Sequence, residues 1–147
     1  MVSSLITSAI GLIMILIAGY VVVTGIIVSS ETVMAAQKEM NTIQSGILMT
    51  NIDISSSTWM NGTMTLTINN TGNMVISDMS DIDLYILEGT SMNRYTYPGY
   101  SRTLSPDTIN PEFWDPDETL TLSISITPEP IWVQVTTPNG ISASGYL

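Results

Sequence analysis

The sequence predicts a long N-terminal helix followed by an all-β sandwich, and two observations lead to this fold class. The first 30 of the 147 residues contain no Asp, Glu, Lys or Arg. From Thr50 onward, apolar residues stop recurring every three to four positions and begin to alternate with polar ones. The first spacing is that of a helix, whereas alternation is typical of strands with one face in water. The chain length suits one domain with an appendage.

Residues 1–30 are expected to form a hydrophobic helix that crosses a membrane. The uncharged run 5–28 has 24 residues and reaches roughly 36 Å at a rise of ~1.5 Å per residue, enough to span a hydrocarbon core. A buried core helix is disfavoured, because a domain of this size rarely encloses a helix that is apolar on every side. A cleaved secretory signal would have a basic segment before a shorter apolar run. None precedes this run, so a retained anchor is favoured.

Small residues recur along this helix at intervals of seven: Ser4, Gly11, Ala18 and Gly25. Seven residues are close to two helical turns, so these four side chains lie on one stripe. Small residues let helices approach closely in lipid, where packing drives association. Gly and Ala are common in such helices, so chance is the alternative, but we expect a helix–helix interface here.

The helix is expected to continue through residues 31–49 as an amphipathic stalk. Val33, Met40, Ile43 and Ile47 follow helical spacing, and residues 35–39 are good helix formers. The pair Ser45-Gly46 is the predicted stop signal. Lys38 is the only Lys or Arg near the helix, so the positive-inside rule gives little information about the orientation of the helix. The Ser-, Thr- and Asn-rich remainder suits export, which places the N-terminus inside the cell and the C-terminal part outside.

Five segments with alternating apolar residues are expected to be strands: 51–55, 63–69, 81–87, 119–126 and 131–135. The last of these should place Ile131, Val133 and Val135 on one face. Turn pairs such as Asn61-Gly62 and Asn139-Gly140 separate the segments. Segments 74–77 and 141–146 are weaker candidates. About seven short strands over residues 50–147 are typical of an immunoglobulin-like β-sandwich.

Residues 89–118 interrupt this rhythm and are expected to form a large loop. The segment is rich in aromatic residues and holds both arginines of the domain. In one interpretation the aromatic rings cap the sandwich. In the other they form a partner surface, because interfaces favour Tyr, Trp and Arg. The candidate partner residues are Tyr95, Tyr97, Tyr100 and Trp114.

Composition excludes several classes of function. Three Lys and Arg stand against 13 Asp and Glu, a formal charge of −10, which opposes binding to nucleic acid. The chain has no Cys and no His, so thiol nucleophiles, His general bases and Cys-bearing zinc sites are ruled out. No Gly-rich phosphate-binding loop precedes its one lysine. We therefore expect no enzymatic activity and no cofactor.

Two groups of carboxylates are candidate calcium ligands: Asp78, Asp81 and Asp83, and Asp115, Asp117 and Glu118. Carboxylates with turn carbonyls hold calcium in extracellular proteins, but neither spacing fits the helix–loop–helix calcium pattern. Solvated strand ends explain both groups equally well. No metal site is predicted, and the first group is the weak candidate.

Two acceptor triplets for N-glycosylation are present, at Asn61 and Asn69. Such triplets also arise by chance in a chain rich in Ser, Thr and Asn. Both fall at predicted strand ends, where a glycan has room if the domain lies outside the cell.

Short motifs spread over nearly the whole chain resemble archaeal type IV pilin-like proteins of the archaellum, in particular the accessory family FlaF/FlaG. Proteins of that family are small, with an N-terminal anchor and an extracellular β-sandwich. The motifs are Ser3-Ser-Leu-Ile-Thr-Ser-Ala-Ile, Ala18-Gly-Tyr-Val, Asn69-Asn-Thr-Gly-Asn, Ile82-Asp-Leu-Tyr-Ile, Trp114-Asp-Pro-Asp-Glu-Thr-Leu and Val135-Thr-Thr-Pro-Asn-Gly-Ile-Ser.

The resemblance implies a type IV pilin-like architecture and a static role in motility. A FlaF/FlaG-like protein is expected to be anchored in the cytoplasmic membrane, to bind the surface layer, and to act in the stator beside related subunits. The alternative is a filament subunit, an archaellin or pilin whose N-terminal helices pack in the filament core. A ligand-binding module on a membrane tether is a third and weaker hypothesis. The resemblance supplies no catalytic residue.

Overall fold

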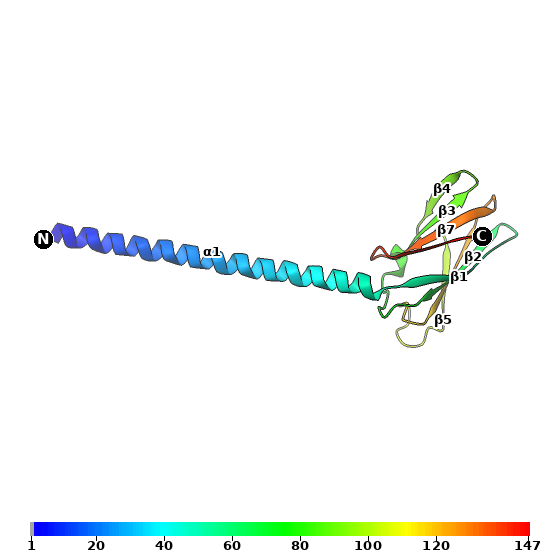
Figure 1. The fold of residues 1–147 in the computed structure, drawn as a ribbon, viewed down its shortest axis with the longest axis horizontal. Helices are drawn as coiled ribbons and strands as arrows, with labels where there is room; N and C mark the ends of the chain where they lie inside the picture. The colour runs from blue at the N-terminus through cyan, green and yellow to red at the C-terminus, as the bar shows by residue number, and fades with distance from the viewer. Residues whose placement is uncertain (1) are drawn as a thin grey trace. The chain divides into compact units, whose positions relative to one another are not determined.

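The computed structural model describes residues 2–147, and the chain separates into two compact units that meet between Thr42 and Ile43. Figure 1 shows one long helix, α1, followed by a domain made of strands. This order confirms the predicted fold class of a long N-terminal helix followed by a β-sandwich.

Helix α1 runs from Val2 to Met49, 48 residues without a proline, and none of them is buried. At ~1.5 Å per residue it is roughly 72 Å long, about twice the thickness of a hydrocarbon core. The helix ends at Met49, three residues beyond Gly46 of the predicted stop signal. The hydroxyl of Thr50 donates to the carbonyl of Gly46 at 2.7 Å and closes that last turn.

The sandwich consists of two four-stranded antiparallel sheets. The first sheet has the order β1-β2-β6-β5, with β1 at Ile52–Met60, β2 at Thr63–Asn70, β6 at Thr119–Ser125 and β5 at Ser101–Ser105. The second has the order β4-β3-β7-β8, with β4 at Ser91–Tyr95, β3 at Asp83–Glu88, β7 at Pro130–Thr136 and β8 at Ser142–Tyr146. A 3-10 turn, η1, at Met79–Asp81 precedes β3.

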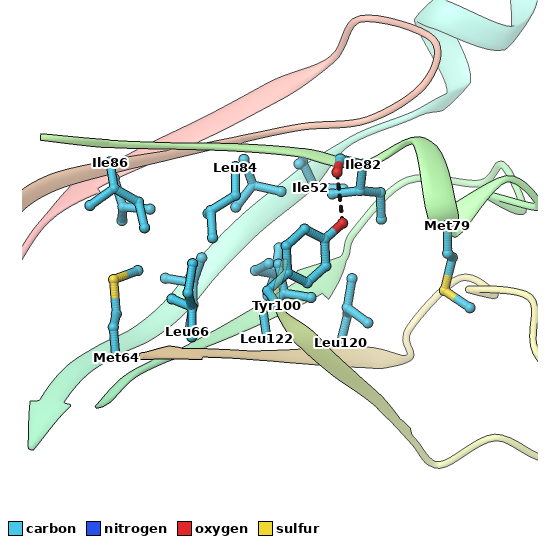
Figure 2. Packing of buried hydrophobic residues seen from close by; sticks show 14 of the residues in the cluster. Ile52, Met64, Leu66, Met79, Ile82, Leu84, Ile86, Tyr100, Leu120 and Leu122 are labelled. Carbon is cyan, nitrogen blue, oxygen red and sulfur yellow. Dashed lines mark hydrogen bonds between the residues drawn. The ribbon is translucent and has the colours of Figure 1, made fainter. Parts of the chain in front are cut away.

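The core lies between the two sheets and is built from the alternating apolar positions of the strands (Figure 2). Each fully buried Leu or Ile contributes about 1.5–3 kcal/mol by leaving water. Since side chains alternate along a strand, each buried position is followed by one on the outer face of its sheet. The fully buried aliphatic residues of the central strands include Leu66, Ile68, Leu84, Ile86, Leu120, Val133 and Val135.

Three expectations about strands require correction. Residues 89–118 are no single loop, because they contain the edge strands β4 and β5, whose mixed polar composition hides their alternation. Segment 74–77 forms no strand and contributes only an isolated bridge between Ile76 and Trp114. Ile131 is 48% exposed although Val133 and Val135 are buried. Pairing between β3 and β7 shifts register after Leu87, which explains why the alternation fails at that end of β7.

Candidate interaction surfaces

The small-residue stripe of α1 is open along its length. A Cβ atom built on Gly11 or on Gly25 would meet no atom within 4 Å. Ala18 is exposed, and Ser4 accepts a hydrogen bond at its carbonyl from the hydroxyl of Ser8 at 2.9 Å. The stripe residues Ser4, Gly11, Ala18 and Gly25 are all exposed, and their role as a helix–helix interface stays a prediction.

The threonine hydroxyls on α1 donate to carbonyls of the helix itself. Thr7 donates to the carbonyl of Ser3 at 2.9 Å, Thr24 to that of Tyr20 at 2.7 Å, and Thr32 to that of Val28 at 2.8 Å. In hydrocarbon an unpaired hydroxyl costs several kcal/mol, so these internal bonds suit an apolar environment. Among the described residues 2–147, α1 is the one helix long and apolar enough to cross a membrane.

The last turn of α1 is bound to the loops at one end of the sandwich, within the unit Ile43–Leu147. The backbone N–H of Asn73 donates to the carbonyl of Met49 at 2.7 Å. The side-chain amide of Asn139 donates to the hydroxyl of Thr50 at 2.6 Å. At Gly72 an added Cβ would lie 2.4 Å from the backbone nitrogen of Asn51, so only glycine fits. Carbonyls at the helix end thus find partners that a free helix end leaves to water.

The predicted partner residues of segment 89–118 do not share one surface. Trp114 is fully buried, and its indole N–H donates to the carbonyl of Glu118 at 2.9 Å. Tyr100 is also buried and donates from its hydroxyl to the carbonyl of Ile82 at 2.6 Å (Figure 2). Both belong to the core, because a ring with a satisfied polar group is more stable away from water. The structure therefore removes them from the predicted partner surface.

Tyr95 and Tyr97 keep more contact with solvent. The hydroxyl of half-buried Tyr95 donates to Glu88, and this bond, together with burial, raises the pKa of Tyr95 to about 12. Tyr97 is 44% exposed and stacks under the guanidinium of Arg102, whose central carbon lies 4.4 Å from the ring centroid. A partner role for this pair remains a prediction.

The structure does not assemble the weak metal candidates into a site. Both carboxylate oxygens of Asp83 are taken by Arg94 at 2.9 Å, and Asp78 accepts from the hydroxyl of Ser77. Across residues 2–147 no group of three acidic side chains is placed to hold an ion. The second cluster shapes its own loop: buried Asp115 accepts from Asn110 at 2.8 Å.

The two glycosylation candidates differ in access. Asn61 is exposed in the β1–β2 turn, with a positive φ of 52°. Asn69 is half-buried in a central strand, and its side-chain oxygen accepts from the hydroxyl of Thr119 at 2.9 Å. Use of either site remains a prediction, and the structure leaves more room at Asn61.

The outer faces of the two sheets have different chemistry, which the sequence analysis missed. The first sheet carries mostly hydroxyls, with exposed Met60 at the end of β1: Thr63, Thr65, Thr67, Thr119, Thr121, Ser123 and Thr103. The second carries the aromatic and aliphatic residues Tyr85, Leu87, Met92, Trp132 and Tyr146 beside the polar residues Asp83, Arg94, Gln134, Thr136, Ser142 and Ser144. The signal was present in the residues between the buried ones, which are mostly Thr or Ser in β2 and β6 but include Tyr85 and Leu87 in β3 and Trp132 in β7.

Comparison with known proteins shows the fold. No protein-family profile matches the chain, and no curated protein matches it. Among solved structures it is similar to the archaellum periplasmic stator protein FlaG from Sulfolobus acidocaldarius, with a TM-score of 0.54 and 19% identity over 67% of this chain and 99% of that one. A chain of the stator complex of FlaF and FlaG from the same organism matches with a TM-score of 0.52 and 19% identity, over 65% and 87% of the two chains.

Proposed function

We propose that this chain is a non-enzymatic, membrane-anchored component of the archaeal motility machinery, acting in the stator of the archaellum and binding the surface layer. The main support is that a sandwich similar in fold to an archaellum stator protein follows an apolar helix with no buried residue. None of the residues of α1, Val2–Met49, is buried, so its apolar surface requires lipid or other helices.

The proposed topology places the N-terminus in the cytoplasm, α1 in the cytoplasmic membrane and the sandwich outside the cell. Residues 5–28 carry no charge, and Glu31 is the first acidic residue after them. The remaining α1 residues, 31–49, would form a stalk between the membrane and the sandwich. The high content of Ser and Thr in residues 50–147 supports export of the sandwich.

Assembly with related pilin-like subunits is part of the proposal. The small-residue stripe of α1 offers close helix packing, and one structural neighbour is itself a complex of two stator proteins. Exposed Tyr97 with Arg102, and a glycan on Asn61, are the proposed features that contact the surface layer.

A filament subunit is the second candidate, and one observation favours it. Val33, Met34, Met40 and Ile43 lie beyond the run that would fill the membrane, yet each is more than half exposed. In a filament core these side chains would be buried against other helices, whereas a stalk leaves them in water.

Electron microscopy of the purified full-length chain separates the two candidates. The stator role predicts particles without helical order and co-purification of surface-layer protein from archaeal membranes. Helical polymers formed by this chain alone would overturn the stator role in favour of the filament. Mass spectrometry of the native N-terminus adds a second arm, since removal of a leader would support filament assembly.

A further inference from the structure

The outer face of the sheet β4-β3-β7-β8, called here the aromatic face, has the composition of a protein interface. Cross-strand partners lie on the same face of a sheet, so the register places Leu87 beside both Met92 and Trp132, and Trp132 beside Tyr146. Tyr85 lies between Arg94 and Gln134 in the same way. Aromatic residues, Met and Arg are enriched in interfaces, and Lys and Glu are depleted there.

The same sandwich supplies an internal reference in its other outer face. Thr65, Thr67, Thr121 and Ser123 occupy equivalent central positions of β2 and β6, and all four carry hydroxyls. A sheet face that remains in water is expected to be polar. Met92, 53% exposed, and Tyr146, 79% exposed, are therefore unusual on the face that carries them.

The net charge of the chain and the neutrality of the aromatic face indicate which partner can bind this face. The chain carries −10, so two copies repel each other wherever their carboxylates face. The aromatic face holds one acid and one base, Asp83 and Arg94. They form a salt bridge in which the guanidinium of Arg94 lies 2.9 Å from both carboxylate oxygens of Asp83. The face is therefore a neutral region on an acidic sandwich, where a second copy can approach without repulsion.

We propose that the aromatic face packs against the aromatic face of a second copy of this chain, sheet against sheet, across a twofold axis. A twofold contact uses the same patch on both copies, so a neutral and apolar patch is complementary to itself. The inference rests on the proposed assembly role and names the neighbour and the surface involved.

The size of the face defines how strong this contact is. Four strands spaced ~4.8 Å, each about six residues long, cover a footprint of roughly 400 Å². A stable interface needs about 800 Å² from each partner, so the contact between free sandwiches is weak. Anchoring both copies by α1 in one membrane raises their effective concentration to the millimolar range, which makes such a contact effective.

Cysteine crosslinking tests the proposal directly, because the chain has no native cysteine. Gln134→Cys and Ser144→Cys place single thiols on neighbouring strands of the aromatic face. Thr121→Cys and Ser123→Cys are matched controls on the hydroxyl face. Each full-length variant is oxidised mildly in archaeal membranes and analysed without reductant.

The expected result is a covalent dimer of this chain from at least one aromatic-face variant, in at least tenfold excess over both controls. Adding Met92→Glu to that variant should abolish the dimer by introducing like charges, whereas adding Thr103→Glu on the other sheet should not. Equal yields from both faces, no dimer from the aromatic face, or a crosslink to a different protein would overturn the proposal. Membrane extraction of the same samples reports on anchoring separately, so loss of the face contact leaves the proposed function standing.

Discussion

Helix α1 and the sandwich differ in whether their apolar residues are buried within the chain. The sandwich buries seventeen hydrophobic residues between its two sheets, whereas α1 buries none over 48 residues. Both regions are rich in Ile, Leu, Val and Met. The sandwich is therefore stabilised by contacts within the chain, and α1 depends on lipid or other helices. The difference teaches that mutations in the two regions will be detected by different measurements, stability for one and association for the other.

The largest expected effect comes from Trp114→Ala, which removes a fully buried ring from the core. The cavity and the lost burial should reduce the free energy of unfolding by about 3–5 kcal/mol. Met14→Ala, a large-to-small change in exposed α1, should leave the unfolding of the sandwich unchanged. Denaturant unfolding of the full-length chain in detergent, followed by tryptophan fluorescence, measures both. An equal loss of stability in the two variants would contradict the different roles of burial in α1 and in the sandwich.

Tyr100→Phe tests the polar part of the core. Without the hydroxyl, the carbonyl of Ile82 loses its partner, which should cost about 1–3 kcal/mol. Burial raises the pKa of Tyr100 to about 12, above its ordinary value of about 10. The folded state therefore holds this proton more tightly, so stability is complete below about pH 10 and decreases as the pH rises toward 12.

Unfolding measured at neutral pH and at about pH 11 should show a smaller decrease for Tyr100→Phe than for the parent chain. Part of the decrease should persist, because the bond to Glu88 and burial also raise the pKa of Tyr95 to about 12. An unchanged pH dependence in the double variant Tyr95→Phe and Tyr100→Phe would contradict this assignment.

Gly25→Leu tests α1, whose contacts do not affect the measured unfolding of the sandwich. A leucine on the small-residue stripe should hold neighbouring helices apart and weaken association about tenfold, which corresponds to ~1.4 kcal/mol. Gly19→Leu is the matched control, since at 3.6 residues per turn position 19 is rotated about 120° from Gly25. Analytical ultracentrifugation in detergent measures the association. Equal weakening by both variants would argue against the stripe, and unfolding of the sandwich should be unaffected by either.

The smallest effect is expected at the junction between the two regions. Asn139→Ala removes the bond to the hydroxyl of Thr50 and should cost about 0.5–1.5 kcal/mol. Hydrogen exchange should quicken at the last turn of α1, near Gly46 and Thr50. Asn41→Ala, in exposed helix, is the control and should change neither quantity. Unchanged exchange at that turn would mean that its attachment to the sandwich is already loose.

Elements with strong local patterns were predictable from the sequence. The uncharged run 5–28 predicted the helix, and β2, β3, β6 and β7 were found because apolar and polar residues alternate in them. The edge strands β4 and β5 were missed, because Ser91–Tyr95 and Ser101–Ser105 have only one neighbouring strand and need few apolar residues. Their pairing partners, β3 and β6, become neighbours only in the folded chain.

The sequence by itself determined which segments bury apolar surface, since hydrophobic periodicity is local and survives without a partner. It therefore supplied the exposed helix, its small-residue stripe and the central strands. Only the tertiary structure decided which aromatic residues face solvent. Tyr100 and Trp114 entered the core, while Trp132 and Tyr146 came to share an outer face. Burial depends on contacts between residues far apart in the chain, and no local pattern encodes the register that brings them together.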